Sequence, residues 1–160
     1  MLDLSAPITP GVSAAGFSLG MTRAYAVRTM GSVAIKPPAK QMMWFLKHLP
    51  GWGKTDGGTS YFYKDVVHLS FSKVGVLYAI YLHEGYAGRL DGEVFIGSDL
   101  EQWVEKYGLE FDEGDEAYYP TVQDQEGFAL ISIEPGRAEA GEPYSVLGFS
   151  VHDWSLQDPR

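Results

Sequence analysis

The chain contains no cysteine among its 160 residues, which excludes a disulfide framework and a thiolate metal site. It also has no long apolar run, because its apolar runs, such as that from Met42 to Leu46, are far shorter than the ~20 residues that cross a bilayer. The first seven residues contain no basic side chain and no continuous apolar stretch, so we expect no secretion signal. These absences predict a soluble, cytoplasmic protein with no membrane partner.

Motifs for catalysis, metal binding and phosphate binding are also missing. No two of the four histidines stand at a metal-ligand spacing, and there is no HExxH motif or Gly-rich phosphate loop. We therefore expect no metal, no cofactor and no catalytic residue. One alternative stays open: strand alternation places His68 and His152 on the less buried side of a sheet, where they could converge on a cleft. The simpler interpretation is two surface histidines.

Positive charge is scarce in the second part of the chain. Residues 1–88 carry eight Lys or Arg and four acids, whereas residues 89–160 carry four Lys or Arg and 17 acids. The whole chain has a net charge of −9. Such asymmetry argues against nucleic acid as a partner and favours a basic protein surface. The alternative is an acidic face that only maintains solubility.

A stretch of sequence occurs twice, at residues 19–31 and 96–108. In both copies an apolar residue and a Gly are followed, eleven positions later, by a second Gly. Thr22 in one copy and Ser98 with Asp99 in the other can cap the first turn of a helix. Gly31 and Gly108 stand where a left-handed helix stop favours a residue without Cβ. We interpret the two copies as helices of a pseudo-symmetric duplication, since two copies do not make a repeat array.

Each expected helix is followed by β-branched and aromatic segments typical of strands. We expect strands at 60–63, 66–72 and 76–82 in the first half, and near 118–120, at 128–133 and at 144–154 in the second. An additional helix is expected at 38–49, and residues 83–92 form the linker between the halves. The predicted fold is α+β: two tandem helix-plus-three-strand repeats, 1–88 and 89–160, form one antiparallel sheet with both helices on one face. The other face is expected to stay partly open.

The first copy resembles a known family. Gly20-Met21-Thr22-Arg23, followed by Gly31, is similar to the helix that opens each repeat of the β-lactamase inhibitory proteins, which are tandem α-β-β-β duplications of about this size. In the second copy only Gly97 and Gly108 of this pattern remain, and Tyr118-Tyr119-Pro120 is similar to an aromatic run of the family. The chain departs from the family in its missing cysteines, its missing export signal and its extra segment at 38–49. The resemblance therefore implies the fold and a binding role, with no catalytic residues to carry over.

An acidic and aromatic loop is the main functional candidate. Five carboxylates lie within seven residues, next to two tyrosines: Glu110, Asp112, Glu113, Asp115, Glu116, Tyr118 and Tyr119. Carboxylates steer association with a basic partner, and aromatic rings supply the desolvated anchors of an interface. The structural alternative is a solvated loop between a helix and a strand.

We therefore expect a non-enzymatic inhibitor, specifically a cytoplasmic bacterial immunity protein that neutralises a cognate toxin or enzyme with a basic surface. Besides the acidic loop, its expected contacts are Trp52, in a Gly-rich loop, and His68 and His152 on the open sheet face. A small-ligand-binding or envelope-assembly module is the alternative; its pocket on the concave sheet would be lined by Tyr78, Tyr81 and Val146. The sequence leaves the oligomeric state open.

Overall fold

The structure is a computed structural model that describes residues 1–30, 59–122, 126–132 and 144–157. The expected helix at 38–49, the helix stop at Gly31 and the contact residue Trp52 lie outside these ranges. The described part is α+β, as predicted. Its helices are α1 (Arg23–Met30) and α3 (Leu100–Tyr107), with a short 3-10 helix η2 (Trp154–Leu156) near the C-terminus. Among the described residues, no helix has the length and apolar character needed to cross a membrane.

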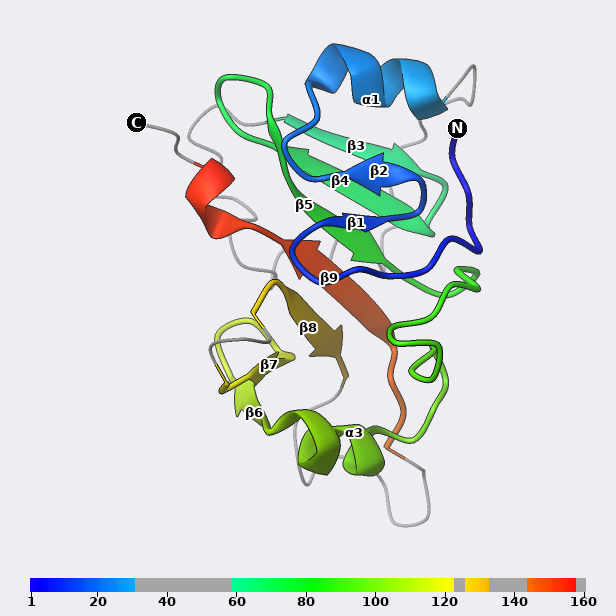
Figure 1. Cartoon of the computed structure of the whole chain (residues 1–160), viewed down its shortest axis with the longest axis vertical. Coiled ribbons are helices and arrows are strands. Elements are labelled where there is room, and N and C mark those ends of the chain that lie inside the picture. The colour runs from blue at the N-terminus through cyan, green and yellow to red at the C-terminus, as the bar shows by residue number, and fades with distance from the viewer. Residues whose placement is uncertain (31–58, 123–125, 133–143, 158–160) are drawn as a thin grey trace.

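Seven of the strands form one antiparallel sheet in the order β3-β4-β5-β9-β8-β7-β6 (Figure 1). β3, β4 and β5 follow α1, whereas four described strands follow α3, one more than we predicted. The additional strand is β6, which begins the segment that we expected to be an acidic loop. The strands are β3 (Thr59–Tyr63), β4 (Val67–Phe71), β5 (Leu77–Leu82), β6 (Leu109–Asp112), β7 (Ala117–Pro120), β8 (Phe128–Ile131) and β9 (Gly148–His152).

The N-terminal arm forms its own two-stranded sheet, β1 (Ser13–Ala14) with β2 (Phe17–Ser18). Tyr86, from the segment between β5 and α3, fixes this arm. Its hydroxyl donates a hydrogen bond to the Ala6 carbonyl and accepts one from the Ala15 N–H at 3.2 Å. These contacts join the arm to the segment that we interpreted as a linker.

Local capping sets the starts of both helices and the end of α3. The Thr22 hydroxyl accepts a hydrogen bond from the Tyr25 N–H at 3.4 Å, and the Asp99 carboxylate accepts one from the Glu101 N–H at 3.1 Å. Gly108 ends α3 in the left-handed conformation, at φ 57°. The predicted caps at Thr22, Asp99 and Gly108 are therefore confirmed.

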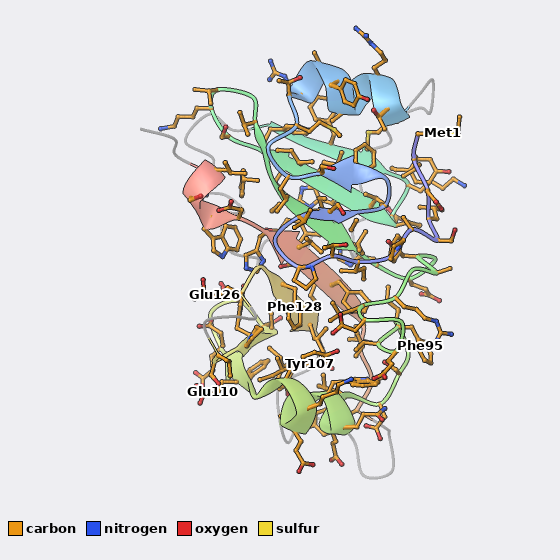
Figure 2. The ribbon with its side chains drawn as sticks, in the orientation of Figure 1. Met1, Phe95, Tyr107, Glu110, Glu126 and Phe128 are labelled. Carbon is orange, nitrogen blue, oxygen red and sulfur yellow. The ribbon has the colours of Figure 1, made fainter. Side chains whose placement is uncertain are left out.

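One face of the sheet packs against both helices. Ala26 and Met30 of α1 and Leu100, Trp103 and Tyr107 of α3 belong to the same hydrophobic cluster as the inward side chains of the strands. Figure 2 shows the rings of Tyr107 and Phe128 next to each other, and their centroids lie 5.7 Å apart at a near-perpendicular angle. The expectation that the helices cover one face is confirmed for α1 and α3.

The opposite face, which we expected to stay partly open, is buried over β4, β5 and β9 and is exposed toward β6 and β7. His68, Tyr81 and His152, which alternation places on this face, are only 2%, 3% and 5% exposed. Serines complete their environment: Ser70 Oγ lies 3.2 Å from His68 Nε2, and Ser150 Oγ lies 2.8 Å from His152 Nδ1. Polar side chains that form hydrogen bonds with each other can be buried at low cost. Alternation therefore separated the two faces correctly but did not reveal that the second face is buried over β4, β5 and β9.

A backbone pattern occurs at the start of both helices. Gly20 and Gly97 have φ values of 82° and 96°, and their N–H groups donate to the carbonyls of Leu77 and Val146 at 2.8 and 2.7 Å. Both glycines thus use a conformation that side chains with Cβ disfavour. The neighbouring hydrogen bonds match as well. Leu77 N–H donates to Met21 O, and Val146 N–H donates to Ser98 O, at 2.9 Å each. Arg23 N–H donates to Gly75 O at 2.8 Å, and Leu100 N–H donates to Tyr144 O at 2.9 Å.

Candidate functional site

The acidic segment is a hairpin formed by β6 and β7. In its register Glu110 faces Tyr119 and Asp112 faces Ala117. Asp112 also holds the turn, because its Oδ1 accepts a hydrogen bond from the Asp115 N–H at 2.9 Å. Alternation in β6 sends Leu109 and Phe111 to the hydrophobic cluster and the two acids to the other face. The carboxylates are therefore presented by an ordered edge of the sheet.

Most of these carboxylates face solvent. Glu110, Asp112 and Glu113 are exposed, and Asp115 and Glu116 are half-buried. Within the described ranges, Glu110, Glu113 and Glu116 form no ion pair; a salt bridge joins Lys106 to Glu93 instead. Figure 2 places Glu110 and Glu126 on the same flank of the molecule. The hairpin is thus a surface of uncompensated negative charge.

The two tyrosines of the hairpin point to opposite faces. Tyr118 is 5% exposed and packs against Phe111, with ring centroids 4.9 Å apart, so it belongs to the core. Tyr119 is half-buried on the other face, and its hydroxyl donates to Asp115 Oδ2 at 3.0 Å. Because adjacent strand residues alternate, only Tyr119 can serve as an aromatic contact beside the acids. The expected role of Tyr118 as a partner contact is replaced by one in packing.

Burial and the neighbouring acids control the protonation of Asp115 and Tyr119. Burial raises the pKa of Asp115, and the hydrogen bond from Tyr119 partly opposes that shift. Burial, together with the charge of Asp115, raises the pKa of Tyr119 above its usual value. The Tyr119 hydroxyl therefore stays protonated and remains a donor at neutral pH.

The two histidines predicted for the site lie on one face with Tyr81 between them. His68 stacks on Tyr81 with ring centroids 5.0 Å apart, and Tyr81 faces Ser150, the partner of His152. Burial, with a smaller contribution from His83, lowers the pKa of His68 to about 3. Burial also lowers the pKa of His152 to about 4, although Asp153 opposes this shift. Both imidazoles are neutral at pH 7, and neither is a surface residue.

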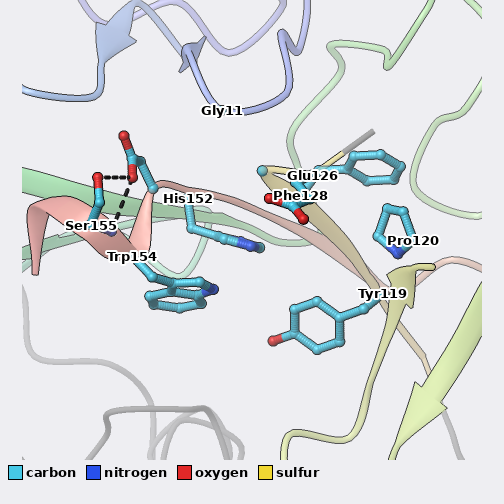
Figure 3. Close-up of a pocket in the computed structure, with 10 residues that line it drawn as sticks. Gly11, Tyr119, Pro120, Glu126, Phe128, His152, Trp154 and Ser155 are labelled. Carbon is cyan, nitrogen blue, oxygen red and sulfur yellow. Dashed lines mark hydrogen bonds between the residues drawn. The ribbon is translucent and has the colours of Figure 1, made fainter. Parts of the chain in front are cut away.

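A partly open cavity of about 490 Å³ lies beside the hairpin (Figure 3). Trp154 stacks on His152 with ring centroids 4.4 Å apart, and Tyr119 lies 5.8 Å from His152. The cavity therefore brings together Tyr119 and His152, both singled out from the sequence, but not His68. Its described lining consists of Gly11, Tyr119, Pro120, Glu126, Gly127, Phe128, His152, Asp153, Trp154 and Ser155.

Trp154 is one of the cavity residues that the sequence analysis missed. It was assigned to the end of a long strand, but β9 ends at His152 and Trp154 begins η2. Asp153 caps this turn, since its Oδ1 accepts hydrogen bonds from the N–H and the hydroxyl of Ser155 at 3.0 and 2.6 Å. An Asp followed two positions later by Ser is typical of such turns and could have predicted the chain reversal.

The chemistry of the cavity is aromatic and acidic. The described lining contains two carboxylates, Glu126 and Asp153, and no Lys or Arg. Within the described part of the chain, no three His, Asp or Glu side chains gather in a way that could hold a metal ion. Stacking and charge are therefore the interactions that these residues offer to a ligand.

No protein-family model matches this chain, and comparison with the curated proteins and the solved structures finds no significant match. The resemblance to the β-lactamase inhibitory proteins accordingly stays an expectation.

The burial of neutral His152 leads to a prediction about how the stability of the fold depends on pH. Because its pKa is about 4 in the folded chain and ordinarily 6.5, the unfolded chain binds more protons below pH 6.5. The contribution of His152 to the free energy of unfolding is complete above pH 6.5 and falls as the pH drops toward 4. We expect His152 to remove about 1–2 kcal/mol from the free energy of unfolding between pH 7.5 and pH 5. Urea denaturation at the two pH values measures the change, and a His152→Gln variant should lose less stability than the native chain. Equal losses would contradict the assignment.

Proposed function

We propose that this protein is a non-enzymatic inhibitor, specifically a cytoplasmic bacterial immunity protein that neutralises a cognate toxin or enzyme with a basic surface. The observation that carries the proposal is the β6–β7 hairpin. It presents the exposed carboxylates of Glu110, Asp112 and Glu113 beside Tyr119, and Glu110 and Glu113 have no described ion pair. A rigid acidic edge with an adjacent aromatic ring suits recognition of a basic protein surface.

The tandem-repeat arrangement is part of this proposal. It is supported by the backbone hydrogen bonds that match between the two helix starts, and by the register at the centre of the sheet. Leu77 of the first half corresponds to Val146 of the second, because they make matching hydrogen bonds. Tyr81 and Ser150, each four residues further along, therefore also correspond. Tyr81 and Ser150 face each other across β5 and β9, as a two-fold relation between the halves requires. We infer that the two halves meet at the β5–β9 pair.

The roles within the interface differ by residue. Glu110 and Glu113 steer the encounter, because neither is committed to a described ion pair. Asp112 and Asp115 hold the turn and the Tyr119 hydroxyl, so they act through the shape of the hairpin. His68 is too deeply buried for direct contact, whereas His152 borders the cavity. The contact surface therefore comprises the hairpin and the rim of the cavity next to it.

A pull-down from cells that produce the protein tests the proposal. The native chain and a Glu110→Lys, Glu113→Lys variant serve as baits at low and moderate salt. A third bait with Glu84→Lys and Glu101→Lys carries the same change of charge at exposed positions outside the hairpin. A basic protein retained by the native and control baits, but not by the hairpin variant, is expected, and it should lose its toxic activity when bound. Retention by all three baits would contradict the hairpin assignment.

One observation favours a second candidate, a small-ligand-binding module. The cavity of about 490 Å³ lies within the size range of small-molecule sites. It is not the pocket that the sequence suggested, because Val146 lies in the hydrophobic cluster on the helix-covered side. A thermal-shift screen against metabolites and lipids distinguishes the candidates, since a ligand-binding module should be stabilised by a compound regardless of changes at Glu110 and Glu113.

A further inference from the structure

We propose that the cavity lined by Tyr119, His152 and Trp154 is a binding site for an organic cation, namely a guanidinium or an alkylated ammonium group. The immunity function proposed above uses only the rim of this cavity, and the inference does not depend on it; the inference names a ligand class for the second candidate, the small-ligand-binding module. The same chemistry is found on basic side chains of proteins and on free small molecules, and the test below distinguishes these two sources.

Aromatic rings form the walls of the site. Trp154 and His152 are stacked at 4.4 Å with an interplanar angle of 24°, and Tyr119 meets His152 at 5.8 Å and 59°. Figure 3 shows the side chains of Tyr119 and Trp154 on opposite sides of the same space. A cation within about 6 Å of an aromatic ring is attracted by the negative charge of the ring face. Trp and Tyr side chains flanking one space therefore favour a cation of this kind.

The charges around the cavity have one sign. Glu126 and Asp153 are its ionisable carboxylates, and its described lining has no basic side chain. Asp115 adds to this field through Tyr119, because the phenol donates its proton to that carboxylate at 3.0 Å. Donation to an anion increases the electron density of the Tyr119 ring and strengthens its attraction for a cation. A neutral ligand would gain nothing from these charges, and an anionic ligand would be repelled by them.

The third ring of the site, the imidazole of His152, does not repel a cation. Burial keeps the pKa of His152 near 4, so the imidazole is neutral at pH 7. The Ser150 hydroxyl, 2.8 Å from Nδ1, holds the ring in position. His152 therefore contributes an uncharged aromatic surface beneath Trp154.

The site is organised before any ligand binds. The Gly127 carbonyl accepts hydrogen bonds from the N–H groups of Gly11 and His152, both at 2.9 Å, and joins the N-terminal arm to the ends of β8 and β9. Asp153 holds the turn that carries Trp154 through two hydrogen bonds to Ser155. Because these contacts already fix the rings, little conformational freedom remains to be lost on binding.

The test titrates four probes into the full-length protein at constant ionic strength, followed by NMR of the Trp154 indole N–H and by calorimetry. Two probes are cations, tetramethylammonium and N-acetyl-arginine methylamide. The other two are neutral: 3,3-dimethylbutan-1-ol, which has the shape of choline without its charge, and maltose, which would stack on the same rings. We expect both cations to shift the Trp154 signal and to bind at least about 5-fold more tightly than either neutral probe.

Variants connect binding to the named residues. Trp154→Leu should weaken cation binding about 5- to 30-fold, whereas Tyr25→Leu, at an exposed ring on α1, should leave it unchanged. Asp153→Asn removes a charge but retains the oxygen that caps η2, so it should weaken the cations alone. Equal binding of charged and neutral probes, preferential binding of maltose, no shift at 50 mM probe, or no effect of Trp154→Leu would each overturn the proposal. Tighter binding of the arginine amide indicates a side chain of a protein partner, and tighter binding of tetramethylammonium indicates a free small cation.

Discussion

Reversing the charges of Glu110 and Glu113 to lysine should slow association with the proposed basic partner by about 10- to 100-fold at low ionic strength. The physical reason is steering, because long-range attraction raises the rate of productive encounters and exposed charges act before contact is made. Both residues are exposed and have no described ion pair. Dissociation should change much less, since the hydrogen bonds of Asp112 and Asp115 that shape the hairpin are left in place.

The control for this prediction is the Glu84→Lys, Glu101→Lys variant, which alters net charge equally at exposed positions outside the hairpin. Stopped-flow or surface plasmon resonance rates at several salt concentrations measure the effect. The association rates of the native and control chains should fall as salt rises, because salt screens the attraction that accelerates their encounter with the partner. The association rate of the hairpin variant should depend on salt only weakly. If the two variants slow association equally, net charge rather than the hairpin governs recognition.

Local signals in the sequence predicted the helices accurately. Thr22 and Asp99 cap α1 and α3, and Gly108 adopts the left-handed conformation that its position required. Each of these features depends on residues within one helical turn, so no knowledge of the rest of the chain is needed. Of the two capping candidates for α3, only Asp99 caps the helix. Ser98 instead donates its hydroxyl to the Phe95 carbonyl and accepts a hydrogen bond from the Trp103 indole N–H.

Strand faces could be predicted, but their burial could not. In β4, Val67 and Leu69 face the helices and His68 faces away, as alternation required. Polarity suggested that the second face would be open, yet His68 and His152 are buried with serine partners. A hydrogen bond between two side chains of the same strand cannot be recognised from composition. Polar residues on a strand are therefore not by themselves evidence for exposure.

The candidate site could be predicted only in part. Tyr119 and His152 were identified from the sequence, but their proximity depends on β7 and β9 both pairing with β8. The composition of residues 110–116 suggested a loop, because acids dominate it. The alternation of Leu109 and Phe111 with Glu110 and Asp112 in β6 was the signal for a strand. Trp154 was missed because its position depends on a turn rather than on the strand before it.

Replacing Gly127 by alanine should lower the free energy of unfolding by about 3 kcal/mol or more, the largest single-residue effect that we expect near the cavity. Gly127 has a φ of 98°, and a Cβ there would lie 2.5 Å from the N and Cα atoms of Gly11. Both atoms belong to the backbone, so no side-chain rotation can relieve the overlap. The N-terminal arm must move, and the hydrogen bond from Gly11 N–H to the Gly127 carbonyl is lost with it.

Gly97 provides the matched control, because its φ of 96° is nearly the same but an added Cβ would meet nothing within 4 Å. Gly97→Ala should therefore cost only the backbone strain, about 1–2 kcal/mol. Urea denaturation of the three chains measures both changes, and the difference between the variants isolates the contact with the arm. Since the Gly127 carbonyl also holds His152, Gly127→Ala should weaken tetramethylammonium binding, whereas Gly97→Ala should not. Equal destabilisation by the two substitutions would show that the arm yields easily and that the cavity does not depend on it.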